Sequence, residues 1–433
     1  MPNGGGRGFV ARIAVVAMAT VLMGVLGMPS ALAAGEPDGT FGDGGLTAFT
    51  IEGLSAGATA VARSGSKFVL GGFAQSDDST HFALARILGN GDLDPTFGGH
   101  DGQVLTDFFQ FSQITDLAVL GSGKILAVGR ATKPNFDTVM AVARYRPNGL
   151  LDTTFSGDGK AVAGFGTALV EAHSLLTLPN GSFLVAGSVG PDIDHLQAAV
   201  AKFLPSGKLD TEFGGGDGLA TVRPPGSFFS EANSVKAGGG GRILIGGTSF
   251  GDLGTTSNFL VARLLSDGRR DTSFSGDGIA TKHQEKADFG NDLAVLPSGK
   301  ILLAGGTVPE GFPPNVAILR FTEAGAFDTS FGVKEVDFGG SDQIFDLSID
   351  GLGRLVGVGT WEDSMAVFRF SANGAPDFAT FGVGGAVALE FPTPSQPSGQ
   401  GAALLTPGAK ILAVGDARTS TGEFGFAAAR LHA

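Results

Sequence analysis

The feature that most constrains the fold is a motif written seven times along the chain. Its clearest copy is Asp152-Thr153-Thr154-Phe155-Ser156-Gly157-Asp158-Gly159. The motif phenylalanines are Phe41, Phe97, Phe155, Phe213, Phe274, Phe331 and Phe381. Neighbouring copies lie between 50 residues (Phe331 to Phe381) and 61 residues (Phe213 to Phe274) apart. A period of this size is typical of arrays, solenoids and propellers, in which each repeat is one structural unit.

Each repeat contains four short apolar runs separated by turn residues. Examples are residues 160–165, 172–178, 301–305 and 259–264. Four strands of about five to seven residues with short turns fit a repeat of about 57 residues, whereas one helix per repeat does not. We therefore expect an all-β fold over residues 34–433, a seven-bladed β-propeller built from seven four-stranded repeats.

Two glycine positions recur with this pattern. One lies in the turn between the second and third runs, as in Gly299-Lys300, where a hairpin requires positive φ. The other follows five residues after the turn Lys, Arg or Ser, and its copies are Gly72, Gly129, Gly187, Gly247, Gly305, Gly359 and Gly415. We expect the second glycine at the end of an inner strand, where backbones crowd around an axis, or as a simple strand terminator.

The fourth run carries one cation per repeat, and an aspartate follows it after eight residues. These pairs are Arg86/Asp94, Arg144/Asp152, Lys202/Asp210, Arg263/Asp271, Arg320/Asp328 and Arg369/Asp377. The run is apolar on both faces, so it should be covered on both, and a covered cation needs a partner. We predict buried or half-buried ion pairs that lock one repeat to the next. A ring of cations that binds an anionic ligand is the alternative.

Two charged residues have no partner at this eight-residue interval. Asp38 has no cation eight residues before it, and Arg430 has no residues left for its aspartate. In an open array both would be unpaired, which is costly for covered charges. In a closed ring they become partners, and closure also removes exposed edge strands. We therefore predict contact between Arg430 and Asp38.

Residues 1–33 have the layout of a secretory signal peptide. Arg7 and Arg12 precede an apolar run that ends near Met28, and Ala31-Leu32-Ala33 supplies small residues for cleavage. We expect a secreted, extracellular protein that begins near Ala34 and has no membrane anchor after cleavage; a retained membrane anchor is the alternative. Loss of the two arginines changes the net charge from −13 to −15. This charge repels phosphate backbones, so no nucleic-acid partner is expected.

The sequence assigns no catalytic, cofactor-binding or metal-binding residue. The six histidines fall at unrelated positions of the repeat, and the absence of cysteine excludes thiol chemistry. The acidic turns hold Asp43, Asp101, Asp158, Asp217 and Asp277. Each offers one carboxylate, whereas calcium takes six or more oxygens, so turn formation explains them. No cofactor is expected, with calcium left open as an alternative.

Together the motifs resemble a known family. The Asp-x-Thr-Phe-Ser/Gly-Gly-x-Asp-Gly motif, the Ser/Asn-Gly-Lys-Ile-Leu-x-x-Gly hairpin and Ala-Arg-Leu/Phe resemble the delta-60 repeat proteins of bacteria. The resemblance covers residues 36–433 and is weaker in the terminal repeats. It implies a β-propeller-like fold in exported proteins and brings no established activity, so it implies no catalytic residues.

Three hypotheses about function follow. The first is a monomeric, non-enzymatic scaffold that binds a protein or cell-surface partner on the face carrying the connections of variable length, such as residues 282–290, 308–315 and 391–401. The second is a hydrolase or lyase with its site in the axial channel. A sialidase-like enzyme is disfavoured, because the single tyrosine, Tyr145, occupies a core position of its repeat. The third is a calcium-stabilised adhesin.

Overall fold

The computed structural model describes residues 34–251, 256–362, 364–391, 403–406 and 410–433. They belong to one compact unit, Ala33–Ala433. The proposed signal peptide, residues 1–33, lies outside the described residues. No helix within the described part of the chain is long and apolar enough to cross a membrane.

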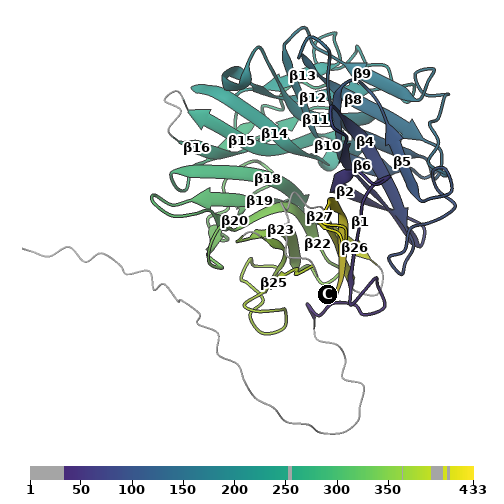
Figure 1. Ribbon diagram of the computed structural model, residues 1–433. Helices are drawn as coiled ribbons and strands as arrows, with labels where there is room; N and C mark the ends of the chain where they lie inside the picture. The colour runs from purple at the N-terminus through teal and green to yellow at the C-terminus, as the bar shows by residue number, and fades with distance from the viewer. Residues whose placement is uncertain (1–33, 252–255, 363, 392–402, 407–409) are drawn as a thin grey trace, which may run out of the picture. The chain divides into compact units, whose positions relative to one another are not determined.

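The described residues form strands joined by turns, with two short 3-10 helices, η1 (Ile193–His195) and η2 (Gly239–Gly241), and no α-helix. The strands fall into groups of four that are antiparallel within each group (Figure 1). From inner to outer strand, the groups are β2 (Ser55–Ser64), β3 (Lys67–Gln75), β4 (Thr80–Ile87) and β5 (Gln103–Thr106); β6 (Phe111–Val119), β7 (Ile125–Thr132), β8 (Thr138–Tyr145) and β9 (Lys160–Ala163); β10 (Leu169–Thr177), β11 (Phe183–Gly190), β12 (Gln197–Phe203) and β13 (Leu219–Val222); β14 (Ser227–Ala237), β15 (Ile243–Gly251), β16 (Ser257–Leu264) and β17 (Ile279–Lys282); β18 (Ala287–Val295), β19 (Ile301–Val308), β20 (Asn315–Phe321) and β21 (Val333–Val336); β22 (Gln343–Ile349), β23 (Leu355–Trp361), β24 (Ser364–Phe370) and β25 (Ala386–Ala388); and β26 (Ala403–Thr406), β27 (Lys410–Arg418), β28 (Phe424–His432) and β1 (Leu46–Phe49). A single bridge between Thr80 and Phe111 joins the first two groups into one eight-stranded sheet.

The sheets are offset by one strand from the sequence repeats. The apolar run after each motif forms the outer strand of the preceding sheet, as β9 does by pairing with β8. The same offset joins the two ends of the compact unit, because β1 pairs with β28 and sets Leu46 opposite Ala429. One repeat therefore supplies strands to two sheets.

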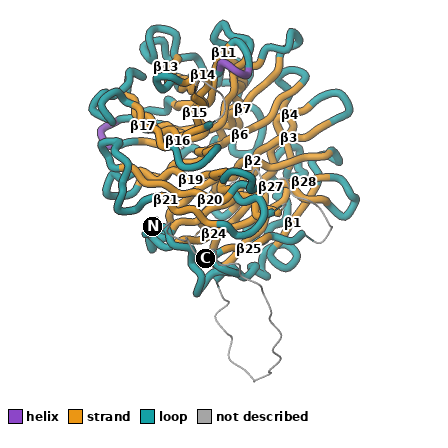
Figure 2. The backbone as a smooth tube through the Cα atoms, turned by 90° about the vertical axis from the view of Figure 1, so that its left-hand side faces the viewer, coloured by secondary structure: helices purple, strands orange, loops and turns teal. Residues whose placement is uncertain are grey.

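The inner strands lie side by side around a common centre, as in a β-propeller (Figures 1 and 2). Each inner strand contacts the next along the chain, and β26 contacts β2. Apolar side chains fill the space between neighbouring sheets; Val128 and Met140 of one sheet, for example, pack in one cluster with Val185 of the next. Between sheets, burial of this apolar surface is the main stabilising contribution.

The motif phenylalanines belong to this core, as predicted. Phe97 and Phe155 are fully buried, and Phe331, the most exposed of the seven, is 4% exposed. Tyr145 is also fully buried, and its hydroxyl donates to Thr106 Oγ1 at 2.9 Å. Because that hydroxyl is satisfied inside the core, Tyr145 is not available as a nucleophile.

The expectation for the second recurrent glycine was wrong in its location. Gly129 lies in β7, the second strand of its sheet, and not in an inner strand. A Cβ atom on Gly129 would lie 1.9 Å from the carbonyl oxygen of Gln113 in β6. That carbonyl stands beside a β-bulge of the inner strand, where the register shifts between Ile114 and Asp116. Gly72, Gly187, Gly247, Gly305 and Gly359 face the same kind of carbonyl at 1.8–2.0 Å. The glycine is therefore required by a bulge on its neighbour.

Candidate functional site

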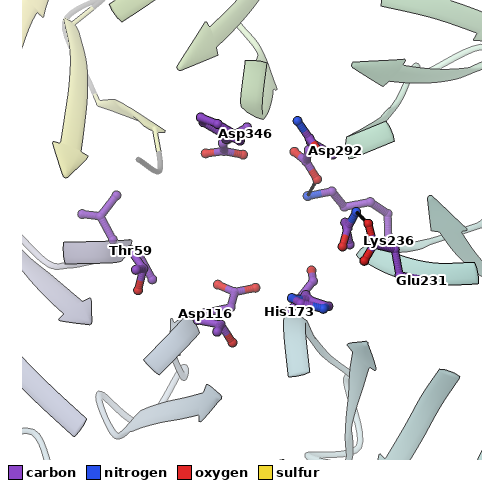
Figure 3. Close-up of a pocket in the computed structure, with 14 residues that line it drawn as sticks. Thr59, Asp116, His173, Glu231, Lys236, Asp292 and Asp346 are labelled. Atoms are coloured by element: carbon purple, nitrogen blue, oxygen red, sulfur yellow. Dashed lines mark hydrogen bonds and ion pairs between the residues drawn. The ribbon is translucent and has the colours of Figure 1, made fainter. Parts of the chain in front are cut away.

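A cavity of about 460 Å³ lies among the inner strands. Six of these strands line it, and its walls are mostly polar. The labelled side chains in Figure 3 point from the surrounding strands toward one open space. They are Thr59 of β2, Asp116 of β6, His173 of β10, Glu231 and Lys236 of β14, Asp292 of β18 and Asp346 of β22.

The β-bulges place these side chains. Six inner strands carry a register shift at the same point, and the residue left out of the pairing lines the cavity in each case. These residues are Thr59, Thr115, His173, Asn233, Asn291 and Phe345. Three of them donate a hydrogen bond to a carbonyl of the next inner strand. The bonds are Thr59 Oγ1 to Ile114 O at 2.6 Å, Asn233 Nδ2 to Gly290 O at 3.0 Å, and Asn291 Nδ2 to Ile344 O at 2.8 Å.

In four of the six strands, the residue after the bulge also links two inner strands. Its side-chain oxygen accepts a backbone N–H from the next inner strand. Asp116 Oδ2 accepts from Leu175 N at 2.7 Å, and Asp292 Oδ2 accepts from Leu347 N at 3.0 Å. In two other strands a serine does the same. Ser174 accepts from Val235 N at 3.3 Å, and Ser234 accepts from Leu293 N at 3.2 Å. A neutral hydroxyl is therefore sufficient for this contact.

The cavity is lined by more negatively charged than positively charged side chains. Four carboxylates, those of Asp116, Glu231, Asp292 and Asp346, face one ammonium, that of Lys236. Lys236 Nζ lies 3.0 Å from Asp292 Oδ1, which also accepts from Ser234 Oγ at 2.5 Å.

Burial shifts the pKa values of several side chains in the cavity. It raises the pKa of Asp116 to about 6, and the negative charge of Asp292 adds to that rise. Burial also raises the pKa of Glu231. His173 is affected in the opposite direction, since burial and the charge of Arg130 lower its pKa to about 4. His173 is therefore neutral at pH 7 and does not offset the carboxylates.

The predicted ion-pair residues lie elsewhere and do not line the cavity: the cations lie near the ends of the third strands, and the aspartates lie in the turns that follow. The structure places each cation beside its aspartate. The nitrogen–oxygen distances are 2.6 Å for Arg86–Asp94, 2.8 Å for Arg144–Asp152, 2.9 Å for Lys202–Asp210, 2.9 Å for Arg263–Asp271, 2.9 Å for Arg320–Asp328, 2.8 Å for Arg369–Asp377 and 2.6 Å for Arg430–Asp38. In addition, each guanidinium covers the ring of a motif phenylalanine, as Arg144 covers Phe155 at 4.6 Å.

Each ion pair joins two consecutive sequence repeats within one sheet, so a separate contact links neighbouring sheets. Arg144 lies in β8, and Asp152 lies in the turn between β8 and β9 of the same sheet. The contact with the next sheet is made by Arg144 Nη1, which donates to Pro205 O at 2.8 Å. The adjacent backbone adds a second link, from Ser156 N to Ser206 O at 3.0 Å.

A second cation, which was not predicted from the sequence, lies beside most of these aspartates. It comes from the glycine-lysine turn, where Lys67 Nζ lies 2.6 Å from Asp94 Oδ2. Lys124, Arg242, Lys300 and Lys410 occupy the same place in other sheets. Burial acts to raise the pKa of Asp94, but hydrogen bonds from Lys67, Thr96 and Arg86 outweigh it and hold the pKa below its ordinary value. The recurrence of a cation after the turn glycine was a signal for this contact.

The acidic turns considered for calcium use their carboxylates locally. Asp101 Oδ1 accepts from Gln103 N at 3.0 Å, and Asp158 Oδ1 accepts from Lys160 N at 2.9 Å. Asp217 and Asp277 make the same contact two residues onward. Within the described ranges, no group of three or more His, Asp or Glu side chains is arranged to hold a metal ion.

Four stretches of this chain match one known protein family. Residues 67–97, 120–155, 241–274 and 296–331 match a β-propeller domain of unknown function, DUF5122. No curated protein sequence matches the chain.

Solved structures resemble the chain in fold at low sequence identity. The polysaccharide lyase Uly1 is 12% identical with a TM-score of 0.51, and the alignment covers 87% of this chain and 89% of that protein. A PL25 ulvan lyase bound to -[GlcA(1-4)Rha3S]- is 9% identical with a TM-score of 0.51, covering 88% of this chain and 95% of the lyase. A protein of unknown function from Dyadobacter fermentans is 13% identical with a TM-score of 0.46, covering 90% and 99%. The likeness to the two lyases concerns the fold alone and agrees with the match to a β-propeller domain.

Proposed function

We propose that this chain is an exported, monomeric, non-enzymatic β-propeller of seven blades that binds a protein or cell-surface partner through its variable loops. The seven groups of four strands and the closed order of inner-strand contacts support the blade count. Residues 1–33 support export by their composition.

The observation that carries the non-enzymatic proposal is the use of the cavity groups to hold the inner strands together. Asp116 accepts two backbone N–H groups, from Leu117 and Leu175, each at 2.7 Å. Asp292 accepts from a serine, a lysine and a backbone N–H. A general acid or base must instead reach a proton of the substrate. The carboxylates of Asp116 and Asp292 are thus explained first by the fold.

The two ends of the strands differ in how repetitive they are. At one end the turns repeat the same glycine-lysine and Asp-x-x-Phe motifs. At the other end the connections differ in length and sequence, from residues 76–79 to residues 309–314. Variation on one face of a repeated scaffold is where a specific partner is expected to bind.

Exposed apolar side chains on both faces allow a matched test of this partner. Phe136 and Ile193 lie in variable connections and are 77% and 69% exposed. Leu150 and Leu352 lie in the repeated turns and are 51% and 78% exposed. The secreted protein would be used to capture partners from culture supernatant and cell surfaces. F136S/I193S should abolish capture, and L150S/L352S should not. Equal capture by both double variants would refute a binding site on the variable face, and an intact mass that includes residues 1–33 would refute cleavage.

A second candidate is a hydrolase or lyase with its site in the axial cavity. It is favoured by one observation: Asp116, with its pKa raised to about 6, shares the cavity with the carboxyl group of Asp292, and a pair of carboxyl groups is the usual glycosidase arrangement. A lyase for an anionic polysaccharide, such as the ulvan lyases of similar fold, is less compatible with four carboxylates and one lysine. Incubation with neutral and anionic polysaccharides would decide. Release of reducing ends or unsaturated products that D116N abolishes would establish the enzyme and overturn the scaffold.

A further inference from the structure

We propose that Ser79, His81 and Asp107 form a catalytic triad on the face of the variable connections, with Ser79 as nucleophile, and that this triad hydrolyses short neutral acyl esters. None of the three residues lines the axial cavity. The activity goes beyond the proposed function, because the argument for a non-enzymatic protein concerns only the groups of that cavity.

The three side chains form a continuous chain of hydrogen bonds. His81 Nδ1 lies 2.5 Å from Asp107 Oδ1, and His81 Nε2 lies 3.1 Å from Ser79 Oγ. Because a carboxylate only accepts, Nδ1 carries the ring proton, and Nε2 accepts from the serine hydroxyl. Ser76 Oγ lies 2.7 Å from Ser79 Oγ and 3.3 Å from the same ring nitrogen, so it supports the nucleophile from a second side. A hydroxyl bonded to an imidazole that a carboxylate orients is the arrangement that activates serine in hydrolases.

The fold does not require a histidine at position 81. In the other sheets, the equivalent residue of the third strand is Val139, Gln197, Asn258, Asn315, Ser364 or Gly425. Two other histidines, His195 and His283, also place Nδ1 beside an aspartate, at 2.6 Å and 3.2 Å. Within the described ranges, only His81 of these three has a serine hydroxyl within hydrogen-bond distance of Nε2. The complete constellation is therefore specific to this sheet.

Backbone contacts fix the two segments that carry the triad. Ser76 N donates to Ser79 O at 2.9 Å and closes the connection between β3 and β4. Lys160 Nζ donates to Asp107 O at 3.0 Å and holds the segment that follows β5. The side chain of His81 is 18% exposed and that of Asp107 is 75% exposed. The imidazole is thus held by its surroundings while the site remains open to a substrate.

The surroundings of Ser79 indicate the class of substrate. In the described part of the chain, the backbone N–H groups of Asp78 and Ser79 donate to no acceptor, so both are available to a developing oxyanion. Phe111 pairs with Thr80 beside this connection and is 39% exposed, which provides an apolar surface for an acyl or alcohol group. Asp77 and Asp78 are exposed and would repel an anionic substrate. A neutral ester fits these three features.

The reaction has two balanced steps. Ser79 Oγ bonds to the acyl carbon as its proton passes to His81 Nε2, and the leaving alcohol takes that proton when its C–O bond breaks. Water then gives a proton to His81 Nε2 and attacks the acyl carbon. The carboxylic acid leaves as Ser79 Oγ recovers the proton. The sum is ester plus water giving acid plus alcohol.

The test uses the full-length secreted protein with p-nitrophenyl acetate at neutral pH and follows the release of p-nitrophenolate. S79A should abolish the catalysed rate, and H81Q should lower it by about 100-fold or more. D107N should lower kcat by about tenfold or more with KM unchanged, because Asp107 positions the imidazole and does not touch the ester. Diisopropyl fluorophosphate should inactivate the protein, and peptide mapping should find the adduct on Ser79.

H195A is the matched control. It removes a histidine of another variable connection that has an aspartate at Nδ1 but no hydroxyl at Nε2, and it should leave the rate unchanged. Thermal unfolding of each variant would verify that the fold is intact. A wild-type rate equal to that of S79A, a loss in H195A as large as in H81Q, or an adduct on Ser76 in place of Ser79 would overturn the triad. S79A should still capture the partner, so a failure of the triad and a failure of the proposed binding function give different results.

Discussion

Asp116 accepts hydrogen bonds that join inner strands, and its ionisation lowers the stability of the folded protein. Its pKa of about 6 in the folded protein lies above the ordinary value of 3.8. The folded state therefore binds more protons than the unfolded state between about pH 4 and pH 6. The contribution of Asp116 to stability is fully present below about pH 4 and falls as the pH rises to 6.

We predict that D116S removes this dependence. The free energy of unfolding of the wild type, minus that of D116S, should fall by about 2–3 kcal/mol between pH 4 and pH 8, since each pKa unit corresponds to about 1.4 kcal/mol. Chemical denaturation at a series of pH values measures this difference. Lys236 and Asp292 act on the same carboxyl group, so K236M should make the dependence steeper. If this difference in the free energy of unfolding stays constant with pH, the ionisation of Asp116 does not lower the stability of the folded protein.

The residues of this site also show what sequence could and could not supply. The aspartate of each outer turn is recognisable because it lies eight residues after a cation in every repeat except the first. Asp116 and Asp292 had no such signal, because the corresponding position of the repeat also holds Ala60, Ser174 and Ser234. His173 had none either, because its own position holds threonine, asparagine or phenylalanine in the other repeats. Their common direction arises from a bulge, and neither apolar periodicity nor motif spacing reports a bulge in advance.

At the scale of the element, the bulged inner strand and the glycine of the second strand form one unit. The glycine was found in the sequence, but its role was assigned to the axis because the sequence does not show which strand bulges. The offset between repeats and sheets was missed for a related reason. Apolar runs identify strands, whereas the assignment of an outer strand to the preceding sheet depends on pairing with residues of another repeat.

We predict that Gly129→Ala is strongly destabilising. The added Cβ would meet Gln113 O at 1.9 Å, so the bulge of β6 would have to move. We expect a loss of about 3 kcal/mol or more in the free energy of unfolding, in the range of severe packing faults. Gly121→Ala is the matched control, because a Cβ there meets no atom within 4 Å. Urea denaturation of both variants measures the effect, and equal midpoints would contradict this account of the bulge.

At the scale of the whole folded unit, the junction between first and last repeats is built like the interior. Arg430 Nε lies 2.6 Å from Asp38, and Nη2 lies 3.0 Å from Thr40 Oγ1. Arg144 makes the same two contacts with Asp152 and Thr154 at 2.8 Å and 3.1 Å. The spacing alone predicts contact between Arg430 and Asp38, because only in a closed ring does every cation of the repeats have an aspartate partner.

We predict that R430A and R144A destabilise the protein equally, by about 3–5 kcal/mol each, the usual scale for removing one partner of a covered ion pair. Equality is expected because both arginines have the same partners and cover a buried phenylalanine. Thermal and urea unfolding of the two variants would be compared. A small loss in R430A beside a large loss in R144A would mean that the junction opens in solution.

The pairing of β1 with β28 has a consequence for the order of events during folding. β1 is among the first strands to be synthesised, yet its partner begins at Phe424, close to the end of the chain. The other sheets can form from segments that are near one another in sequence. The last one must bring together segments almost the whole chain apart, a slow step because such contacts close the largest loop. Until β28 has been synthesised and has paired, β1 remains without its partner strand, and the nascent protein is vulnerable to aggregation and proteolysis.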